Sequence, residues 1–219
     1  TRYTSYGKDF ILIDTAGLRR KSKVSEDVEY YSNLRAIKSL EQADVCIIMI
    51  DATRGLEAQD LNIISLANKN GKGILIVVNK WDLIEKDHKT AVQIENTIKE
   101  RLGTLKYIPV IFTSVITKQR VLKSLEKIIE VYENKIRKVS TSKLNDAILP
   151  LIERNPPPAY RGKYIRIKYI TQLPTNSPVF AFFCNHPKYV EESYKRFLEN
   201  QIRDKFEFDG VTIKVVFRN

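Results

Sequence analysis

The sequence predicts an α/β fold, in which helices cover both faces of a parallel sheet and a smaller α+β domain follows. Four short apolar runs have the length and composition of buried parallel strands, at residues 10–13, 45–50, 74–78 and 108–112. Between and after them, apolar residues recur every three or four positions, as on one face of a helix. These residues are Tyr30, Leu34, Ile37 and Leu40; Ala58, Leu61, Ile64 and Ala67; Ile94, Ile98 and Leu102; and Val121, Leu125, Ile128, Ile129, Tyr132 and Ile136. Such alternation favours an open sheet that binds ligands beyond the carboxyl ends of its strands.

A polar tetrapeptide, Asn79-Lys80-Trp81-Asp82, follows the 74–78 strand directly. The Asp82 carboxylate can accept two hydrogen bonds, which suits the N1–H and 2-amino donors of guanine, whereas adenine lacks this pair of donors. Asn79 is suited to bracing the loop, and the Lys80 methylenes can cover one face of the base. The pattern therefore indicates a guanine-binding loop, with an ordinary surface turn as the alternative.

A second motif, Asp14-Thr15-Ala16-Gly17, follows the 10–13 strand. Asp14 is suited to hold Mg²⁺ through a water molecule, because Mg²⁺ keeps several waters and takes few carboxylates. Gly17 lets a backbone N–H approach a γ-phosphate, since no Cβ stands in the way. An ordinary glycine turn is the alternative for this motif alone, but two such motifs at strand ends together predict a GTP site.

The segment Asp14-Thr15-Ala16-Gly17-Leu18-Arg19-Arg20-Lys21-Ser22-Lys23-Val24 resembles the switch II signature of the Der (EngA) family, as does the tryptophan within Asn79-Lys80-Trp81-Asp82. These are bacterial ribosome-assembly GTPases with two tandem GTPase domains and a C-terminal KH-like domain. The resemblance covers essentially the whole chain, matched to the second GTPase domain and the KH-like domain. It implies a partial Ras-like P-loop GTPase sheet, GTP or GDP and Mg²⁺ as cofactors, GTP hydrolysis, and the large ribosomal subunit and rRNA as partners.

The chain contains no G-x-x-x-x-G-K-[ST] segment, which would cradle the phosphates of a nucleotide. By resemblance, the segments not represented are the first GTPase domain and then the first strand, phosphate loop and switch I of the second. We therefore expect a truncated or partly represented protein, a sheet with a gap at its central strand, and activity that needs the missing loop. The alternative is a variant that has lost nucleotide binding. Leu18 occupies the place of the water-orienting Gln of many small GTPases, so no catalytic residue is identified and slow turnover is expected.

A second guanine loop is expected after the 108–112 strand. The stretch from Thr113 to Val121 resembles the S-A-L-T-G-Q stretch of the family, with Val115 in place of the small Ala and Lys118 in place of the Gly. A backbone N–H makes the contact to guanine O6 in this loop, so we predict Ser114 and Val115 as nucleotide neighbours. Asp51, at the end of the 45–50 strand, could approach the Mg²⁺ region, but a turn role is favoured.

The net charge of +11 and the pI near 9.5 suit a polyanionic partner such as nucleic acid, although charge by itself slightly favours solubility as the explanation. Residues 1–140 carry 24 basic and 18 acidic groups, and residues 141–219 carry 13 basic and 8 acidic groups. The excess of positive charge per residue is therefore larger in the shorter C-terminal part. The sequence has no signal peptide and no long apolar span. We therefore expect a cytoplasmic, monomeric protein with no membrane contact.

The remaining residues predict a second domain, with the boundary placed between 1–139 and 140–219. The expected order is a helix from about residue 141 capped by Thr141 or Ser142, strands at 164–170 and 179–184, a helix opened by Pro187, and a last strand at 211–217. This α-β-β-α-β order resembles the KH-like domain that closes Der proteins, without the G-x-x-G loop of ordinary KH domains. A basic sheet face could meet rRNA or pack against the first GTPase domain. Its residues are Arg166, Lys168, Lys214 and Arg218.

Two other functions stay open from the sequence alone. One is an RNA-binding module with no catalysis of its own, because the phosphate loop is absent and the chain is basic. The other is an Era-type GTPase with a KH domain. Two observations argue against it: the combination of Asp-Thr-Ala-Gly with Asn-Lys-Trp-Asp, and the absence of G-x-x-G.

Overall fold

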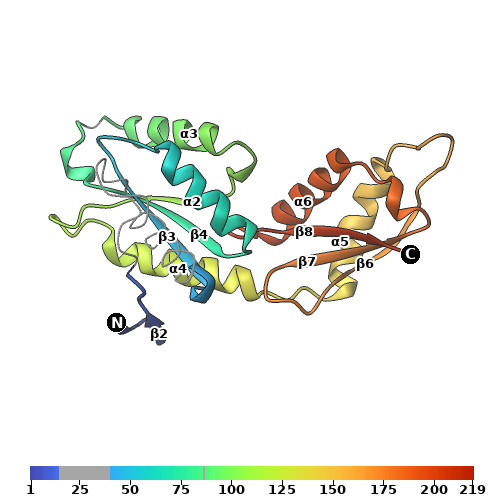
Figure 1. Ribbon diagram of the computed structural model, residues 1–219, viewed down its shortest axis with the longest axis horizontal. Helices are drawn as coiled ribbons and strands as arrows, with labels where there is room; N and C mark the ends of the chain where they lie inside the picture. Colours follow the sequence, from blue (N-terminus) through green and yellow to red (C-terminus); the bar gives the residue numbers. More distant parts are fainter. Residues whose placement is uncertain (15–39, 86) are drawn as a thin grey trace, which may run out of the picture. The chain divides into compact units, whose positions relative to one another are not determined.

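The computed structural model describes residues 1–14, 40–85 and 87–219. The chain divides into two compact units, Thr1–Glu130 and Val131–Asn219, each of which is described by itself. The division falls within helix α4 (Val121–Ile136), drawn in yellow-green in Figure 1. The sequence predicts a domain boundary after residue 139, and that boundary stays a prediction.

A parallel sheet forms the centre of the first unit. Its strands are β3 (Val45–Asp51), β4 (Gly73–Asn79) and β5 (Val110–Phe112), in the order β3-β4-β5 (Figure 1). Residues 73–78 of β4 are all buried, which explains why this strand is a continuous apolar run instead of an alternating one. Three of the four predicted runs therefore form the predicted parallel strands.

Helices cover both faces of this sheet, as predicted. On one face, Ile74, Ile76 and Val78 of β4 pack in one cluster with residues of α2 (Ala58–Lys69) and α3 (Thr90–Leu102). On the other face, Leu75 and Val77 of β4 and Ile111 of β5 pack against Ile128 of α4. Because side chains alternate along a strand, successive residues of β4 supply two separate cores.

The first predicted strand, 10–13, is not part of the parallel sheet. Instead β1 (Arg2–Ser5) and β2 (Lys8–Ile11) form an antiparallel hairpin, and Ile11 is 78% exposed. Tyr6 and Gly7 close the hairpin with φ angles of 52° and 68°, the left-handed pair that a tight two-residue turn requires. The local turn therefore gives β2 its partner, and Phe10 of β2 packs against the cluster around Leu75.

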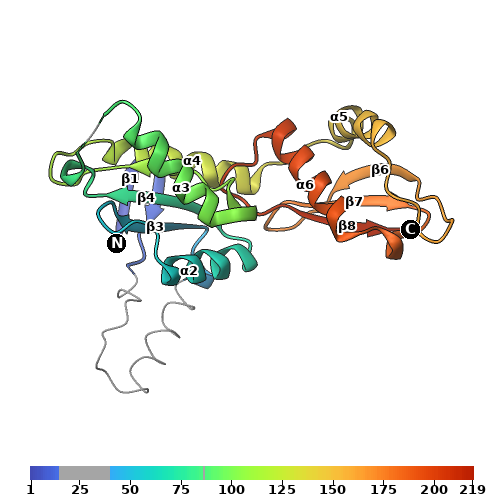
Figure 2. The ribbon, with the colours of Figure 1, turned by 90° about the horizontal axis from the view of Figure 1, so that it is seen from above.

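The second unit has the predicted α-β-β-α-β order. Its elements are α5 (Thr141–Arg154), β6 (Ile167–Gln172), β7 (Val179–Cys184), the 3₁₀ turn η3 (Pro187–Tyr189), α6 (Glu192–Phe206) and β8 (Lys214–Arg218). The sheet order is β6-β7-β8, with β6 antiparallel and β8 parallel to β7, and Figure 2 shows the three strands side by side. Leu144, Ile148 and Ile152 of α5 join Leu198 and Ile202 of α6 in one core with the sheet.

Three local details of this unit differ from the prediction. Pro187 opens the 3₁₀ turn η3 instead of the helix, which begins at Glu192. Ser140, one residue before the predicted cap, is the N-cap of α5, because its side chain accepts a hydrogen bond from the Lys143 backbone N–H. A register shift between Ile167 and Tyr169 interrupts the pairing of β6 with β7. Ile167 packs on the core, whereas Tyr169 is exposed and stacks on Phe183. Strict alternation along the strand would place Ile167 and Tyr169 on the same face, and the irregularity places them on opposite faces.

The side chain of Asn145 joins α5 to the edge strand β6. Its amide nitrogen donates to the Ile170 carbonyl at 2.9 Å, and its amide oxygen accepts from the Ile170 N–H at 2.8 Å. These bonds satisfy backbone groups that an edge strand otherwise leaves unpaired. Within the described ranges, no helix is both long enough and apolar enough to cross a membrane.

Candidate functional site

Three loops meet at the carboxyl edge of the parallel sheet. The register places Asp51 of β3 beside Asn79 of β4. Backbone hydrogen bonds then join the loops, from Ala52 N–H to the Asn79 carbonyl at 2.9 Å and from Trp81 N–H to the Thr113 carbonyl at 3.0 Å. The Thr113 N–H in turn donates to the Val78 carbonyl at 2.8 Å. The residues after β3, β4 and β5 therefore form one connected edge, where ligands of open sheets bind.

The Asn79–Asp82 segment is a tight turn anchored by an aromatic residue. Lys80 has a left-handed backbone (φ 63°), and the 3₁₀ turn η1 (Trp81–Leu83) follows it at once. Trp81 is only 4% exposed, and its ring centroid lies 4.4 Å from that of Phe112. The turn thus directs a large side chain into the core, which fixes the position of the two polar residues on either side of it.

Two side-chain oxygens of this turn are buried acceptors. The amide oxygen Oδ1 of Asn79 and the carboxylate oxygen Oδ1 of Asp82 receive no hydrogen bond within the described part of the chain, although Asp82 makes other interactions. A buried acceptor that receives no hydrogen bond costs about 1–3 kcal/mol. An N–H donor brought to this edge would remove that cost for Asn79, whose predicted role is to brace the turn.

Lys80 makes an ion pair that the sequence analysis did not anticipate. Its Nζ lies 2.7 Å from Oδ2 of Asp51, and Oδ1 of Asp51 accepts from the backbone N–H and the hydroxyl of Thr53. The ammonium of Lys80, followed by the donors of Thr53, holds the pKa of the Asp51 carboxyl well below its usual range. Asp51 also closes a turn, since its carbonyl accepts from the N–H groups of Arg54 and Gly55. The predicted turn role is therefore present, together with the positioning of Lys80.

The loop after β5 is formed although its two variant residues are bulky. Ser114 is fully buried, and its hydroxyl accepts from the Thr117 N–H at 3.2 Å. Lys118 stands where the family pattern has Gly and adopts the left-handed backbone that favours Gly, with φ 58°. Val115 is 60% exposed, so its extra bulk points to solvent instead of into the loop. Ser114 thus lies in the same edge as the Asn79–Asp82 turn.

The phosphate end of the predicted site is described only in part. Asp14 is exposed and lies shortly after β2. Thr15, Ala16 and Gly17 lie outside the described residues, as do Leu18, the basic run at 19–23 and most of the helix predicted at 30–40. Among the residues that the structure does describe, no three His, Cys, Asp or Glu side chains gather to hold a metal ion.

The four predicted RNA contacts are all exposed. Lys168 lies in β6, Lys214 and Arg218 lie in β8, and Arg166 comes just before β6, where its backbone N–H donates to the Asn185 side chain at 2.8 Å. They are thus available to a partner, and their role as RNA contacts stays a prediction.

Residues 2–134 match the family described as the elongation factor Tu GTP binding domain, which defines this part of the chain as a GTP-binding domain. Residues 138–218 match the KH-domain-like region of EngA bacterial GTPase enzymes, C-terminal. The chain is 59% identical over 218 residues to the GTPase Der of Amoebophilus asiaticus and 58% identical to that of Cytophaga hutchinsonii. The chain belongs to the Der (EngA) family of GTPases, as its motifs indicated.

These matches cover all of this chain and 50% of each relative, so the chain spans about half the length of the curated relatives it matches. Among solved structures, Era in complex with MgGDPNP and nucleotides 1506–1542 of 16S ribosomal RNA has a similar fold, with a TM-score of 0.51. The similarity covers 99% of this chain and 78% of that one at 17% sequence identity, and at this identity it shows the fold alone.

Proposed function

We propose that this chain supplies the guanine-recognising part of a GTP-binding and GTP-hydrolysing protein that acts in assembly of the large ribosomal subunit. The observation that carries the proposal is the turn Asn79–Asp82, which is held beside Ser114 at the carboxyl edge of the sheet and keeps side-chain acceptors buried there. Membership of the Der family supports hydrolysis as the activity.

In this proposal each residue has a distinct role. Asp82 accepts hydrogen bonds from N1–H and the 2-amino group of guanine, and the backbone at Ser114 and Val115 donates to O6. Asn79 braces the turn, and the methylenes of Lys80 cover the base while Asp51 holds its ammonium at 2.7 Å. Both guanine loops are thereby positioned by the same backbone hydrogen bonds.

The predicted phosphate end comprises Asp14, Thr15, Ala16 and Gly17. Asp14 offers the hard oxygen ligand that Mg²⁺ prefers, and it would hold the ion through a water molecule. Magnesium supplies charge neutralisation at the phosphates when it is bound. The backbone at Gly17 would approach the γ-phosphate.

Partners and setting are part of the same proposal. The net charge of +11 supports rRNA as a partner, with Arg166, Lys168, Lys214 and Arg218 as candidate contacts. The resemblance to the Der family, whose members are ribosome-assembly GTPases, supports a ribosomal site of action. We further propose that the protein acts as a cytoplasmic monomer on the large subunit.

Nucleotide affinities measured on the protein at full length test the guanine assignment. Wild type should bind GTP far more tightly than ATP, and Asp82→Asn should lower GTP affinity by about 100-fold, because the paired acceptors are lost. Xanthosine triphosphate should bind better to Asp82→Asn than to wild type, since its 2-oxo group accepts the hydrogen bond that an amide donates. Glu85→Gln, an exposed change nearby, should leave all three affinities unchanged. Equal GTP affinity in wild type and Asp82→Asn would refute the assignment.

An RNA-binding module without catalysis is the second candidate, and the basic balance of the chain favours it. Filter binding of RNA at increasing salt, combined with a GTP hydrolysis assay on the same preparation, separates the two functions. Steep salt dependence with no GTP turnover would favour the binding module.

A further inference from the structure

Two tyrosines of the second unit stack face to face next to a tight turn. The ring centroids of Tyr160 and Tyr189 are 4.8 Å apart, with 10° between the ring planes. The guanidinium of Arg161 lies over the Tyr160 ring at 5.4 Å, and the ammonium of Lys163 lies over the Tyr189 ring at 5.1 Å. We call these four residues the tyrosine stack.

The turn that carries the tyrosine stack places an arginine where glycine or asparagine is the ordinary residue. Tyr160 and Lys163 exchange backbone hydrogen bonds of 3.1 and 2.9 Å, and Arg161 and Gly162 between them have φ angles of 49° and 75°. Such a two-residue turn favours Asn-Gly, because both residues need a left-handed backbone. The stability of the turn therefore does not explain why an arginine stands at position 161. What Arg161 adds is a positively charged side chain.

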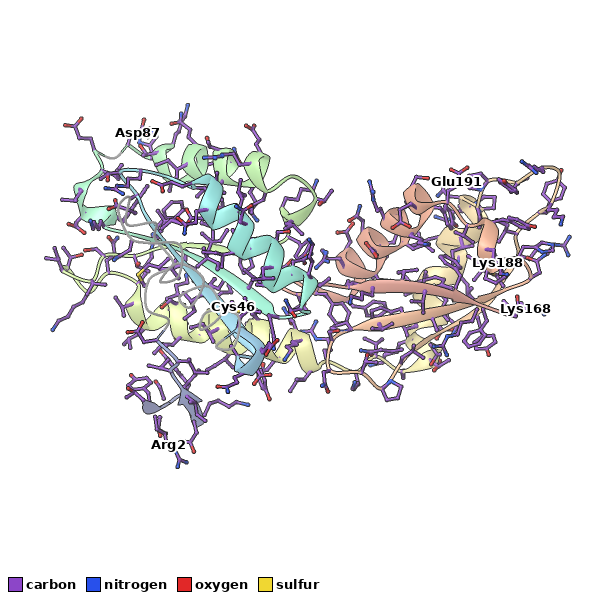
Figure 3. The ribbon with its side chains drawn as sticks, viewed as in Figure 1. Arg2, Cys46, Asp87, Lys168, Lys188 and Glu191 are labelled. Carbon is purple, nitrogen blue, oxygen red and sulfur yellow. The ribbon has the colours of Figure 1, made fainter. Side chains whose placement is uncertain are left out.

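The surroundings of the tyrosine stack are basic, aromatic and exposed. Residues 154–190 contain six Lys or Arg and no Asp or Glu, although the chain has 26 acidic residues. Tyr160, Arg161 and Lys163 are exposed, and Tyr164 beside them is 76% exposed. Figure 3 labels Lys168 and Lys188, which belong to this acid-free segment, and Glu191, the acidic residue that follows it.

We propose that the tyrosine stack is a binding site for unpaired RNA nucleotides, with a base stacked on a tyrosine ring and the cations contacting phosphate. Sequence-specific and single-strand RNA binding both rely on aromatic side chains that stack on unpaired bases, and on Arg and Lys that contact the backbone. The long side chains of Arg161 and Lys163 are exposed, so either can move from the ring to a phosphate when a base takes its place. An acidic protein segment would satisfy the charges but would not use the flat ring faces.

This site is separate from the four basic residues predicted earlier, and it rests on the proposed role of the second unit in RNA binding. The probe is a short single-stranded RNA that contains 2-aminopurine, titrated against the full chain. Fluorescence of 2-aminopurine falls on stacking, so quenching reports ring contact and anisotropy of an end label reports affinity.

Tyr160→Leu tests the ring, because Tyr160 lies outside the hydrophobic core, whereas Tyr189 packs against it. We expect binding about tenfold weaker, loss of the quenching, and an unchanged salt dependence. Tyr160→Phe keeps the ring and should bind and quench as wild type does. Unchanged thermal unfolding of both variants confirms that the unit is intact.

Arg161→Asn tests the cation while favouring the turn. We expect the slope of log affinity against log salt to become shallower by about 0.7, the value for one phosphate contact to a single strand. Lys195→Gln removes the same charge from α6, where Lys195 pairs with Glu192 at 2.9 Å, and should leave the slope unchanged.

If Tyr160→Leu binds and quenches as wild type does, the proposed site is overturned, while RNA binding by the unit remains in place. Equal competition by polyaspartate and by unlabelled RNA would assign the surface to an acidic protein and also overturn it. Absence of any RNA binding by wild type would overturn the proposed RNA function itself, so the two failures are distinct.

Discussion

The carboxyl edge of the first unit and the tyrosine stack of the second present their ligand-facing groups in opposite ways. Asp51, Asn79 and Ser114 come from segments far apart in the sequence and are joined by backbone hydrogen bonds. Tyr160, Arg161 and Lys163 come from one exposed turn, completed by Tyr189. The first arrangement fixes the direction of buried hydrogen-bonding groups, as the proposed discrimination between bases requires. The second offers ring faces and long charged side chains, as the proposed stacking of unpaired bases requires.

The largest expected effect tests whether the first site depends on the core beneath it. Trp81→Ala should lower the free energy of unfolding by about 3–5 kcal/mol, because it empties a buried aromatic position next to Phe112. Urea unfolding measures this loss of stability. It is followed by far-UV circular dichroism, because the substitution removes the only tryptophan of the chain and with it the tryptophan fluorescence signal. Leu83→Ala, two residues away and exposed, should change stability by less than about 0.5 kcal/mol. Equal effects of the two changes would mean that the turn is not anchored by its tryptophan.

The next effect concerns how α5 is fixed to β6 in the second unit. Asn145→Ala should cost about 2 kcal/mol, because it leaves the N–H and the carbonyl of Ile170 without their partner. Chemical denaturation gives the value, and Asp146→Ala at the neighbouring exposed position is the matched control. A cost as small as that of the control would show that water replaces the side chain at this edge.

A smaller effect distinguishes the observed cap of α5 from Ser142, one of the two predicted caps. Ser140→Ala should destabilise the protein by about 1 kcal/mol, since the Lys143 N–H loses its acceptor. Ser142→Ala should change stability by only a few tenths of a kcal/mol, because its hydroxyl bonds a surface carboxylate, that of Asp146. Thermal unfolding of both variants decides between the positions, and the reverse ranking would restore the cap expected from the sequence.

The smallest expected effect is the pH response of the Asp51–Lys80 pair. The folded-state pKa of Asp51 lies below its unfolded value, so the pair contributes stability above the ordinary Asp pKa of about 3.9, and this is lost as pH falls further. Wild type should therefore lose more stability than Asp51→Asn between pH about 5 and pH about 3. Asp204→Asn, an exposed change in α6, should follow wild type. Parallel pH curves for wild type and Asp51→Asn would show that the ion pair is not maintained in solution.

Much of the first site was predictable because its components are ends of parallel strands. Apolar runs mark the strands, and the carboxyl ends of neighbouring parallel strands share one edge, so Asn79 and Ser114 had to lie on the same side of the sheet. The pair of Asp51 with Lys80 was missed, although Asp51 ends β3 in register with Asn79. The position of Asp51 at a strand end was visible in the sequence. The ion pair also depends on the left-handed backbone of Lys80, which the residue type does not indicate.

The amino-acid sequence by itself determined the α/β class, the element order of the second unit and the family, because periodicity and short motifs depend on residues only a few positions apart. Only the tertiary structure decided that β2 pairs in a hairpin outside the sheet, that Tyr169 faces away from the core, and that Tyr160 stacks on Tyr189. Each of these depends on a turn or a register shift that brings distant residues together. Local pattern constrains such geometry weakly, because one residue of shift reverses the face on which a side chain lies.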